Sequence, residues 1–294
     1  LHAEPAVKYQ FIAAHPQEFK ITVMCRVLGV SRSGYYAWGN RPTSPRKMAD
    51  QSLTEQIEMI HQQSRRTYGS LSIQKELAKN GIKCGHNRVA RLMGQVGLSA
   101  KQSHKFKIST TDSNHDQPIA PNLLERDFTS ERPNQKWLGD ITFIPTAEGW
   151  LYLAVILDLY SRRIVGWAMA ASLETSLVLA ALRMALDTRQ PEPGLLHHSD
   201  RGSQYASHDY RDLLTKYQIQ ASMSRKGNCY DNAPMESFFG TLKTELIHHR
   251  HYLTRMEAKT DIFEYIEVFY NRYRRHSTLG YLAPVAFEKL PVPA

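Results

Sequence analysis

The chain has 294 residues, of which 42% are hydrophobic and 22% are charged. This length allows two or three domains with hydrophobic cores. The apolar runs, such as 151–157, are far shorter than the roughly 20 residues of a membrane helix, and the start lacks the pattern of an export signal, so we expect a soluble cytoplasmic protein that binds no membrane. The isolated Cys25, Cys84 and Cys229 argue against a disulfide framework and a structural zinc site.

Positive charge is concentrated in the first part of the chain. Residues 1–110 carry 17 basic and 6 acidic side chains, a net +11, whereas residues 111–294 carry 20 and 22, a net −2. This asymmetry predicts that residues 1–110 bind nucleic acid and that residues 111–294 carry the acidic residues of an active site. A merely soluble basic surface is the alternative.

The first expected helical pair lies in residues 1–48. Residues 21–38 are typical of a short helix, a turn at Gly29 and a second helix with Ser31 as its N-cap. This spacing is that of a helix-turn-helix, although small helical pairs also occur without DNA-binding function. The aromatic pair Tyr35–Tyr36 is expected in the core.

A second pair is expected within residues 49–110. Residues 71–77 and 86–93 have helical apolar spacing and are separated by a break at Asn80–Gly81. Arg88 and Arg91 lie opposite the apolar side chains of the second helix. We therefore expect these two arginines to face a DNA groove or phosphates.

Residues 111–132 are rich in small polar residues and proline, so we expect a linker there. Beyond it the pattern becomes β-rich and then alternates, which predicts an α/β domain over residues 133–247. The expected strands are 141–144, 151–157, 164–169, 194–198 and 219–223, and the expected helices are 175–188, 207–217 and one after Asp231–Asn232. Residues 248–294 form a basic, aromatic tail with a helix over 256–275.

Three carboxylates stand out in the α/β domain. Asp140 is expected at the start of the first strand, and Asp200 follows a short strand, where Gly202 lets the chain turn. Glu236 is separated from Asp200 by 35 residues. Three carboxylates that converge in this way could hold two divalent cations, and such a two-metal site can cut and join phosphodiesters.

Glu236 is expected in the first turn of a helix that Asp231 or Asn232 caps. The positive end of that helix helps to keep the carboxylate ionised. Lys243 follows Glu236 by two turns and returns to within about 20° of the same face, where it could contact a DNA phosphate. A lone acid of this kind would more often be a solvated surface residue, and it is the joint spacing that favours a site.

Several neighbours compete for roles in this site. Asp158 could be a metal ligand, but a turn-forming aspartate is favoured. We interpret His197 and His198 as strand-end residues, since no third soft ligand is near. Gln204, Asn228 and Asn232 are expected either as hydrogen-bonding support or as DNA contacts. The pair Phe238–Phe239 is expected in the core.

Four blocks carry a family resemblance. Residues 133–145, 198–205, 222–245 and 270–287, which include PNQKWLGDITFIP and HSDRGSQY, look like the signature blocks of one family. With them the chain resembles the transposases of the insertion-sequence-three family, whose catalytic core is similar to retroviral integrase. The match covers nearly the whole chain.

The resemblance implies an RNase H-like fold, a mixed five-stranded sheet flanked by helices, preceded by helical DNA-binding regions. It implies a DD(35)E triad of Asp140, Asp200 and Glu236, with Lys243 as the family's basic residue after the glutamate. The implied cofactor is Mg²⁺, two ions per site, with Mn²⁺ expected to substitute. The implied partners are the terminal inverted repeats, target DNA and further copies of the chain on DNA, which places the protein at the nucleoid.

The implied reaction is cleavage at the ends of the element, which frees a 3′-hydroxyl that attacks a second phosphodiester without a covalent protein intermediate. Two other readings remain open, namely a nuclease that cleaves without joining and a regulator that only binds the ends. The chain begins at Leu1, and related elements produce a fused protein whose upstream part contributes end recognition and a leucine-rich coil. We therefore expect tight end binding to depend partly on such a segment.

Overall fold

The computed structural model describes residues 4–42, 44–101, 117–225 and 229–291. The chain forms two compact units, one that ends at Gln56 and one that begins at Ile57. In the described ranges, no helix is both long and apolar enough to cross a membrane.

The first unit contains three short helices around a small core of Ile12, Met24 and Cys25. The helices are α1 (Pro5–Ala14), α2 (Ile21–Leu28) and α3 (Arg32–Gly39). Gly29 has a left-handed φ of 63°, and the Ser31 hydroxyl accepts a hydrogen bond from the Gly34 amide at 2.9 Å. The predicted turn and cap are therefore confirmed, whereas α1 was not predicted. Tyr36 is 44% exposed, so the expectation that it lies in the core is wrong.

The predicted second helical pair is also confirmed. It consists of α5 (Ser70–Lys79) and α6 (His86–Gln95), which contact each other. Their buried residues are Ile73, Leu77, Val89, Leu92 and Met93. The longer helix α4 (Pro45–Gln63) precedes them and was not predicted.

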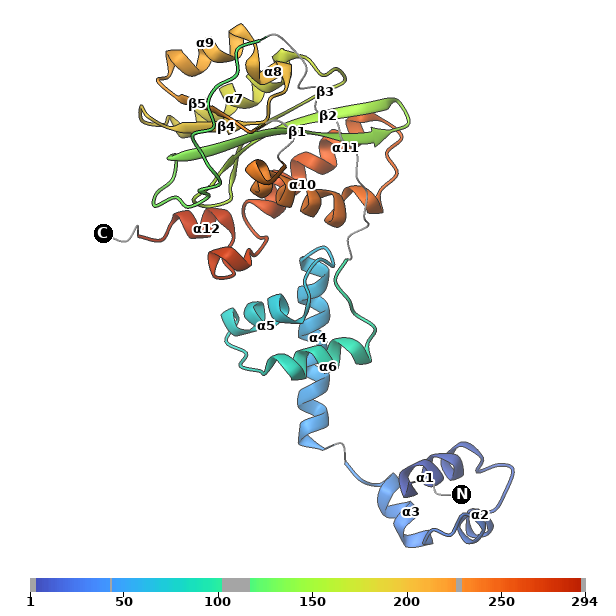
Figure 1. Ribbon diagram of the computed structural model, residues 1–294. Helices are drawn as coiled ribbons and strands as arrows, with labels where there is room; N and C mark the ends of the chain where they lie inside the picture. The colour runs from blue at the N-terminus through green and yellow to red at the C-terminus, as the bar shows by residue number, and fades with distance from the viewer. Residues whose placement is uncertain (1–3, 43, 102–116, 226–228, 292–294) are drawn as a thin grey trace. The chain divides into compact units, whose positions relative to one another are not determined.

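A mixed five-stranded sheet organises the second unit (Figure 1). The strands are β1 (Lys136–Thr146), β2 (Gly149–Asp158), β3 (Ile164–Ala170), β4 (Leu196–Ser199) and β5 (Gln220–Met223). Their order is β3-β2-β1-β4-β5, with antiparallel pairs among the first three strands and parallel pairing of β1 with β4 and of β4 with β5. This is the predicted RNase H-like sheet.

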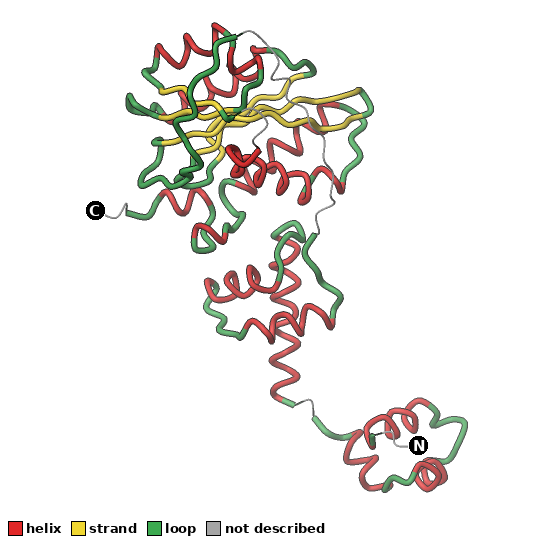
Figure 2. The backbone as a smooth tube through the Cα atoms, in the orientation of Figure 1, coloured by secondary structure: helices red, strands yellow, loops and turns green. Residues whose placement is uncertain are grey.

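Helices cover both faces of this sheet (Figure 2). One face carries α7 (Thr175–Arg189), α8 (Ser203–Ala206) and α9 (His208–Lys216), and the other carries α10 (Ala233–Glu245) and α11 (Arg255–Phe263). Successive residues of β2 pack into different cores, because side chains alternate across a strand. Leu153 and Val155 join the core under α10, whereas Ala154 and Ile156 join the core under α7.

The helix expected over 256–275 is confirmed from Arg255 to Tyr270, but it is not α-helical throughout and it ends before residue 275. After α11 the chain continues as the π-helix η3 (Glu264–Tyr270), whose Tyr265, Phe269 and Tyr270 are buried. The remaining elements are the short helices η1 (Cys229–Asn232), η2 (Ile247–His249), η4 (Ser277–Leu279) and α12 (Pro284–Glu288). Glu288 accepts bonds from Arg163 and Arg189, so α12 is attached to the sheet domain.

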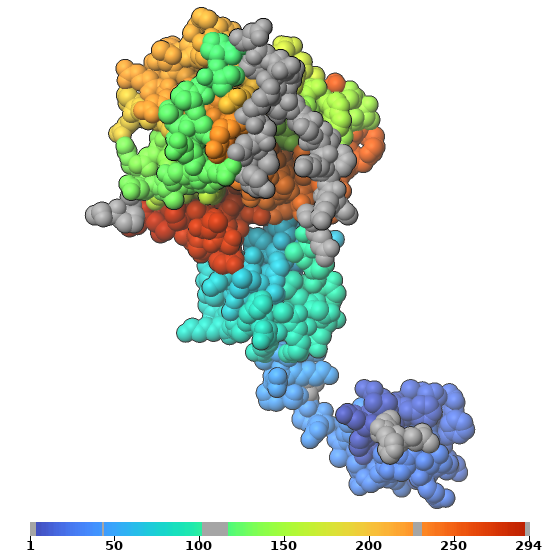
Figure 3. All heavy atoms as spheres, in the orientation of Figure 1, coloured from blue at the N-terminus to red at the C-terminus, as the bar shows by residue number. Residues whose placement is uncertain are grey.

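The expected linker 111–132 is described only from residue 117 onward. In that part Leu124 is 2% exposed and belongs to the core under α10. The Pro121 carbonyl accepts a bond from Met223, and the Ser222 hydroxyl accepts one from the Leu123 amide. Figure 3 shows this green segment on the surface of the sheet domain. Residues 121–124 are therefore packed against β5 and the core.

Candidate active site

Two of the predicted carboxylates lie side by side at the junction of β1 and β4. The parallel register pairs Leu138 with His198 and Gly139 with Ser199, so the next residues on the two strands are Asp140 and Asp200. Asp140 is the fifth residue of β1 and not its start, because pairing with β2 and β4 extends the strand back to Lys136. Both aspartates are partly buried.

Glu236 lies in the first turn of α10, as predicted, and is exposed. Lys243 lies in the last turn of the same helix and is half-buried. The charges of Glu236 and Lys243 both act on Asp140, the first raising and the second lowering its pKa. The helix therefore presents an acid and a base toward the aspartate pair.

The Asp140 carboxyl has a pKa well above its usual range. Burial is the largest cause, and repulsion from Asp200 is the next. The Ile141 amide, which donates to Oδ1 at 2.7 Å, opposes these effects. Burial likewise lowers the pKa of the Lys243 ammonium, while Asp140 raises it. Crowded carboxylates of this kind favour the approach of a cation.

The segment before α10 differs from the prediction. Asn232 is the N-cap residue, but neither it nor Asp231 caps the helix through its side chain. The Asn232 amide instead donates to Asp140 Oδ2 at 2.9 Å. The Asp231 carboxylate is fully buried and accepts bonds from Arg225 and Arg126. The expected capping role is wrong because these two side chains have partners in the sheet domain.

Gly202 and Gln204 lie just beyond Asp200. Gly202 has a φ of −60°, which any residue adopts, so the predicted need for glycine flexibility is wrong. Its amide donates to Asp200 Oδ1 at 2.9 Å and thereby orients the carboxylate. Gln204 donates to the Leu173 carbonyl at 3.3 Å. Asn228 lies outside the described residues.

Sequence reasoning missed a buried polar layer behind the aspartates. His197 is hydrogen-bonded to Tyr210 at 2.7 Å, and His198 lies 2.8 Å from the Ser222 hydroxyl. The charges of Asp140 and Asp200 act on the phenol of Tyr205, which is 2% exposed. The motif HSDRGSQY contained this signal, since His198 and Tyr205 flank Asp200, but nothing in the spacing shows that these side chains turn inward.

Asp158 has a structural role. It ends β2, is fully buried, and accepts hydrogen bonds from the amides of Asn134 and Tyr160 and from the Trp137 indole. Arg189 lies 3.7 Å from its carboxylate. The favoured interpretation as a turn-forming aspartate agrees with this geometry.

The predicted DNA-contacting arginines lie on α6. Arg91 is exposed and donates to Gln95 at 3.3 Å, whereas Arg88 is half-buried and its charge acts on Cys84. The apolar residues of α6 are buried on its other side. This arrangement leaves the basic face of α6 at the surface.

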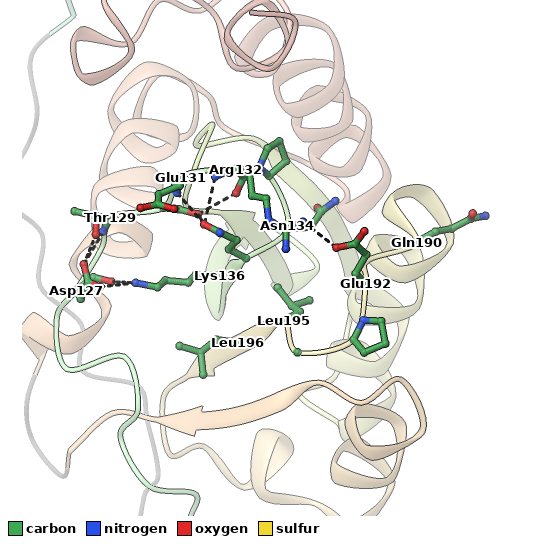
Figure 4. Close-up of a pocket in the computed structure, with 15 residues that line it drawn as sticks. Asp127, Thr129, Glu131, Arg132, Asn134, Lys136, Gln190, Glu192, Leu195 and Leu196 are labelled. Atoms are coloured by element: carbon green, nitrogen blue, oxygen red, sulfur yellow. Dashed lines mark hydrogen bonds and ion pairs between the residues drawn. The ribbon is translucent and has the colours of Figure 1, made fainter. Parts of the chain in front are cut away.

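One hollow near the sheet lies away from the carboxylates. It has a volume of about 680 Å³ and is lined by Asp127, residues 129–136, Gln190 and residues 192–196, at the start of β1 and β4 (Figure 4). Ion pairs join Lys136 to Asp127 and Arg132 to Glu192 around it. Asp140 follows Lys136, the first residue of β1, by four residues, which is roughly 13 Å at about 3.3 Å per residue. This hollow is therefore not part of the carboxylate site.

The donor chemistry of the carboxylates fits hard divalent cations, because all the donors are oxygen atoms. The register that makes Asp140 and Asp200 neighbours places two carboxylates where one cation could bind both. In the conformation described, no group of three His, Cys, Asp or Glu side chains within the described ranges is close enough to hold one ion. Of the three candidate carboxylates, Glu236 is the exposed one, whereas Asp140 and Asp200 are partly buried.

Comparison with known families decides the identity of this domain arrangement. Residues 130–229 and 236–290 match integrase core domain families, and residues 48–106 match an HTH-like domain. The chain is 44% identical, over 96% of its length and 98% of the relative's, to transposase InsF of insertion sequence IS3A from Escherichia coli K12. The chain belongs to the IS3 family of transposases.

A further relative and two solved structures are also similar to this chain. A 31 kDa protein of insertion element IS600 from Shigella sonnei is 52% identical over 90% of the chain and 97% of its own length. Among solved structures, the chain resembles a simian T-cell lymphotropic virus intasome (TM-score 0.48, 14% identity, 81% of this chain and 77% of that chain). It also resembles the HTLV-2 integrase catalytic core with magnesium (TM-score 0.42, 16% identity, 53% and 97%).

The family establishes the general class of activity. An integrase core domain in a transposase belongs to an enzyme of the polynucleotidyl transferase kind, and the HTH-like domain implies binding to DNA.

Proposed function

We propose that this transposase cleaves the ends of its insertion sequence and joins the released 3′-hydroxyls to target DNA, with Asp140, Asp200 and Glu236 as the catalytic triad. The register of β1 and β4 is the observation that supports this most, because it makes Asp140 and Asp200 neighbours across two parallel strands. The charge of Glu236, which acts on Asp140, supports the third member.

The three carboxylates would hold two Mg²⁺ ions, with Mn²⁺ as a substitute. Bound there, the ions would neutralise charge in the transition state and activate the attacking oxygen. The residues of the chain would position the reacting groups. Gly202 orients the Asp200 carboxylate through its amide, and Asn232 orients Asp140.

Lys243 would contact a phosphate beside the triad. The charge of Asp140 acts on its ammonium, and a DNA phosphate would be a second negative group beside the same ammonium. The same triad would serve water in cleavage and the 3′-hydroxyl in joining, since both steps need only an aligned oxygen and charge neutralisation. No protein nucleophile is required.

Gln204 would contact DNA near Asp200. Because two ends must be brought together, the active form would be a multimer on DNA.

The basic face of α6 would bind the terminal repeats through Arg88 and Arg91. Arg88→Ala or Arg91→Ala should weaken binding by about 1–3 kcal/mol if the contact is to a base edge. Unchanged binding in both variants would remove α6 from the DNA interface.

The test is incubation of purified protein with labelled DNA that carries the repeats flanking its own gene. The arms contain Mg²⁺, EDTA, or the Asp200→Ala protein, and nicked and joined strands are scored. Cleavage with joining that is lost in both control arms is the expected result. Cleavage without joining would indicate a nuclease instead, and binding without cleavage would indicate a regulator. Asp200→Ala should leave DNA binding nearly unchanged.

A further inference from the structure

Two arginines converge on one buried carboxylate beside the candidate active site. Arg225 donates to Asp231 from Nε at 3.1 Å and from Nη2 at 3.0 Å, and its backbone amide donates at 3.0 Å. Arg126 donates from Nε at 3.0 Å, and the Asn122 amide adds a bond at 3.0 Å. Asp231 is fully buried, and these bonds hold the pKa of its carboxyl far below its usual range.

A third arginine belongs to the same cluster. Arg201 donates from Nε to the Ser224 carbonyl at 2.6 Å, and Ser224 directly precedes Arg225. The cluster is continuous with the triad at two points. Arg201 directly follows Asp200, and Asp231 directly precedes Asn232, whose amide is bonded to Asp140.

Two of these guanidinium groups share one carboxylate and keep much of their surface open. Arg126 and Arg225 both donate to Asp231, and the charge of Glu125 also acts on Arg225. The side chains of Arg126 and Arg225 are 46% and 55% exposed. By contrast Arg189, which bonds Glu288 through two nitrogens, is only 12% exposed.

We propose that Arg126, Arg201 and Arg225, here called the arginine surface, bind phosphates of the DNA strand next to the scissile bond. Guanidinium groups suit this role because their planar donors match the oxygens of a phosphate. Asp231 holds two of them in place before DNA arrives, which lowers the cost of ordering long side chains on binding. The inference rests on the proposed function, since it takes the strand to pass over the triad.

The first test measures the salt dependence of DNA binding by full-length protein. Each phosphate contact that is lost should lower the slope of log affinity against log salt by about 0.9 between roughly 50 and 200 mM salt. The variants are Arg201→Gln, which leaves Asp231 untouched, and Arg225→Gln. All proteins carry Asp200→Ala and are kept in EDTA, so that binding is measured without cleavage.

The matched control is Arg132→Gln. Arg132 is also an exposed, ion-paired arginine, with a 57% exposed side chain and Glu192 as its partner at 2.8 Å, but it precedes β1 and lines the hollow at the start of β1 and β4. This variant removes the same charge and should leave the slope unchanged. Thermal unfolding of each variant excludes a loss of folded protein, and Arg201→Gln remains interpretable if Arg225→Gln does not fold.

The second test locates the contact on the DNA. Neutral methylphosphonates replace single phosphates on either side of the cleavage position, and the affinity loss is measured with each protein. At a contacted phosphate the loss should be severalfold for the parent protein and absent for Arg201→Gln or Arg225→Gln, because the contact is already missing. Equal losses in parent and variants at every position, or unchanged salt slopes, overturn the arginine surface. Failure of the proposed function would appear separately, as wild-type protein that does not cleave with Mg²⁺.

Discussion

The Asn232 side-chain amide donates to Asp140 Oδ2 at 2.9 Å, and this bond joins the start of α10 to the middle of β1. Asn232 is only 6% exposed. Glu236 lies one turn farther along α10, so the bond fixes the helix that carries the third carboxylate relative to the first carboxylate. The two residues come from distant parts of the sequence, and no spacing rule relates them.

We expect Asn232→Leu to reduce strand cleavage by about tenfold to a hundredfold, because a buried carboxylate oxygen loses its donor at a cost of about 1–3 kcal/mol. The Mg²⁺ concentration needed for half-maximal cleavage should rise, while DNA affinity in EDTA stays unchanged. Cleavage assays over a range of Mg²⁺ concentrations, with binding measured in parallel, check this. A loss of affinity equal to the loss of cleavage would assign Asn232 to DNA and not to Asp140.

Acid should destabilise the protein through two buried histidines. Burial lowers the pKa of His197 to about 3 and that of His198 to about 4, against about 6.5 in the unfolded chain. Both pKa values are lowered by folding, so the stability they contribute is present above pH 6.5 and is lost as the pH falls toward 4. Between pH 6.5 and pH 4, each histidine should lower the free energy of unfolding by about 1.4 kcal/mol for every unit by which the pH falls.

His197→Phe removes one of the two buried histidines that take up a proton on unfolding. The slope of the unfolding free energy against pH should therefore fall by about 1.4 kcal/mol per pH unit. Urea unfolding at several pH values between 4 and 7 measures it. The control is His208→Phe, since the His208 side chain is 78% exposed. An identical pH dependence in wild type and His197→Phe would show that His197 is not buried in the neutral form.

A buried ion pair fastens the end of α10 to the C-terminal part. Arg274 donates to Glu245 from Nε at 2.9 Å and from Nη2 at 2.7 Å, and the Tyr265 hydroxyl donates at 2.7 Å. Arg274→Met leaves a buried carboxylate without its cation and should cost about 3–5 kcal/mol of unfolding free energy. Urea unfolding measures this loss.

Two further variants test the origin of that loss. Adding Glu245→Gln to Arg274→Met should recover part of the stability, because the uncompensated charge is then removed. Arg132→Met breaks an exposed pair and should change stability by less than about 1 kcal/mol. A double variant that is no more stable than Arg274→Met would contradict the interpretation as a coupled pair.

The elements that sequence reasoning placed correctly have strong local patterns. The turn at Gly29 with its Ser31 cap and the helical pair over α5 and α6 depend on short-range chemistry. The amino-terminal half of β1 was missed because glycine and aspartate disfavour strands, and only pairing on both sides forms it there. Helix α4 was missed although Leu53, Ile57 and Ile60 repeat at helical spacing, so the signal was present.

The candidate site was predictable in its residues but not in its connections. The spacing of Asp200 and Glu236 and the family blocks single out the carboxylates, whereas the partners of the buried Asp231 depend on how residues 122–126 fold back. The π-helix η3 could not be predicted from the sequence either, because it forms where Tyr265 and Phe269 pack into the core. Such features follow from tertiary packing, which a local pattern does not encode.

Gly166 is the glycine that the packing of the sheet requires most. A Cβ atom there would overlap the Ala181 carbonyl and lie 2.7 Å from the Ala185 Cβ, so β3 approaches α7 too closely for any side chain. We expect Gly166→Ala to destabilise the protein by at least about 1–3 kcal/mol, as overpacking does. The control is Gly240→Ala in α10, where a Cβ meets nothing within 4 Å and should stabilise the helix by about 0.5–1 kcal/mol. Unfolding curves compare the two, and equal stability in both variants would mean that β3 and α7 can move apart at little cost.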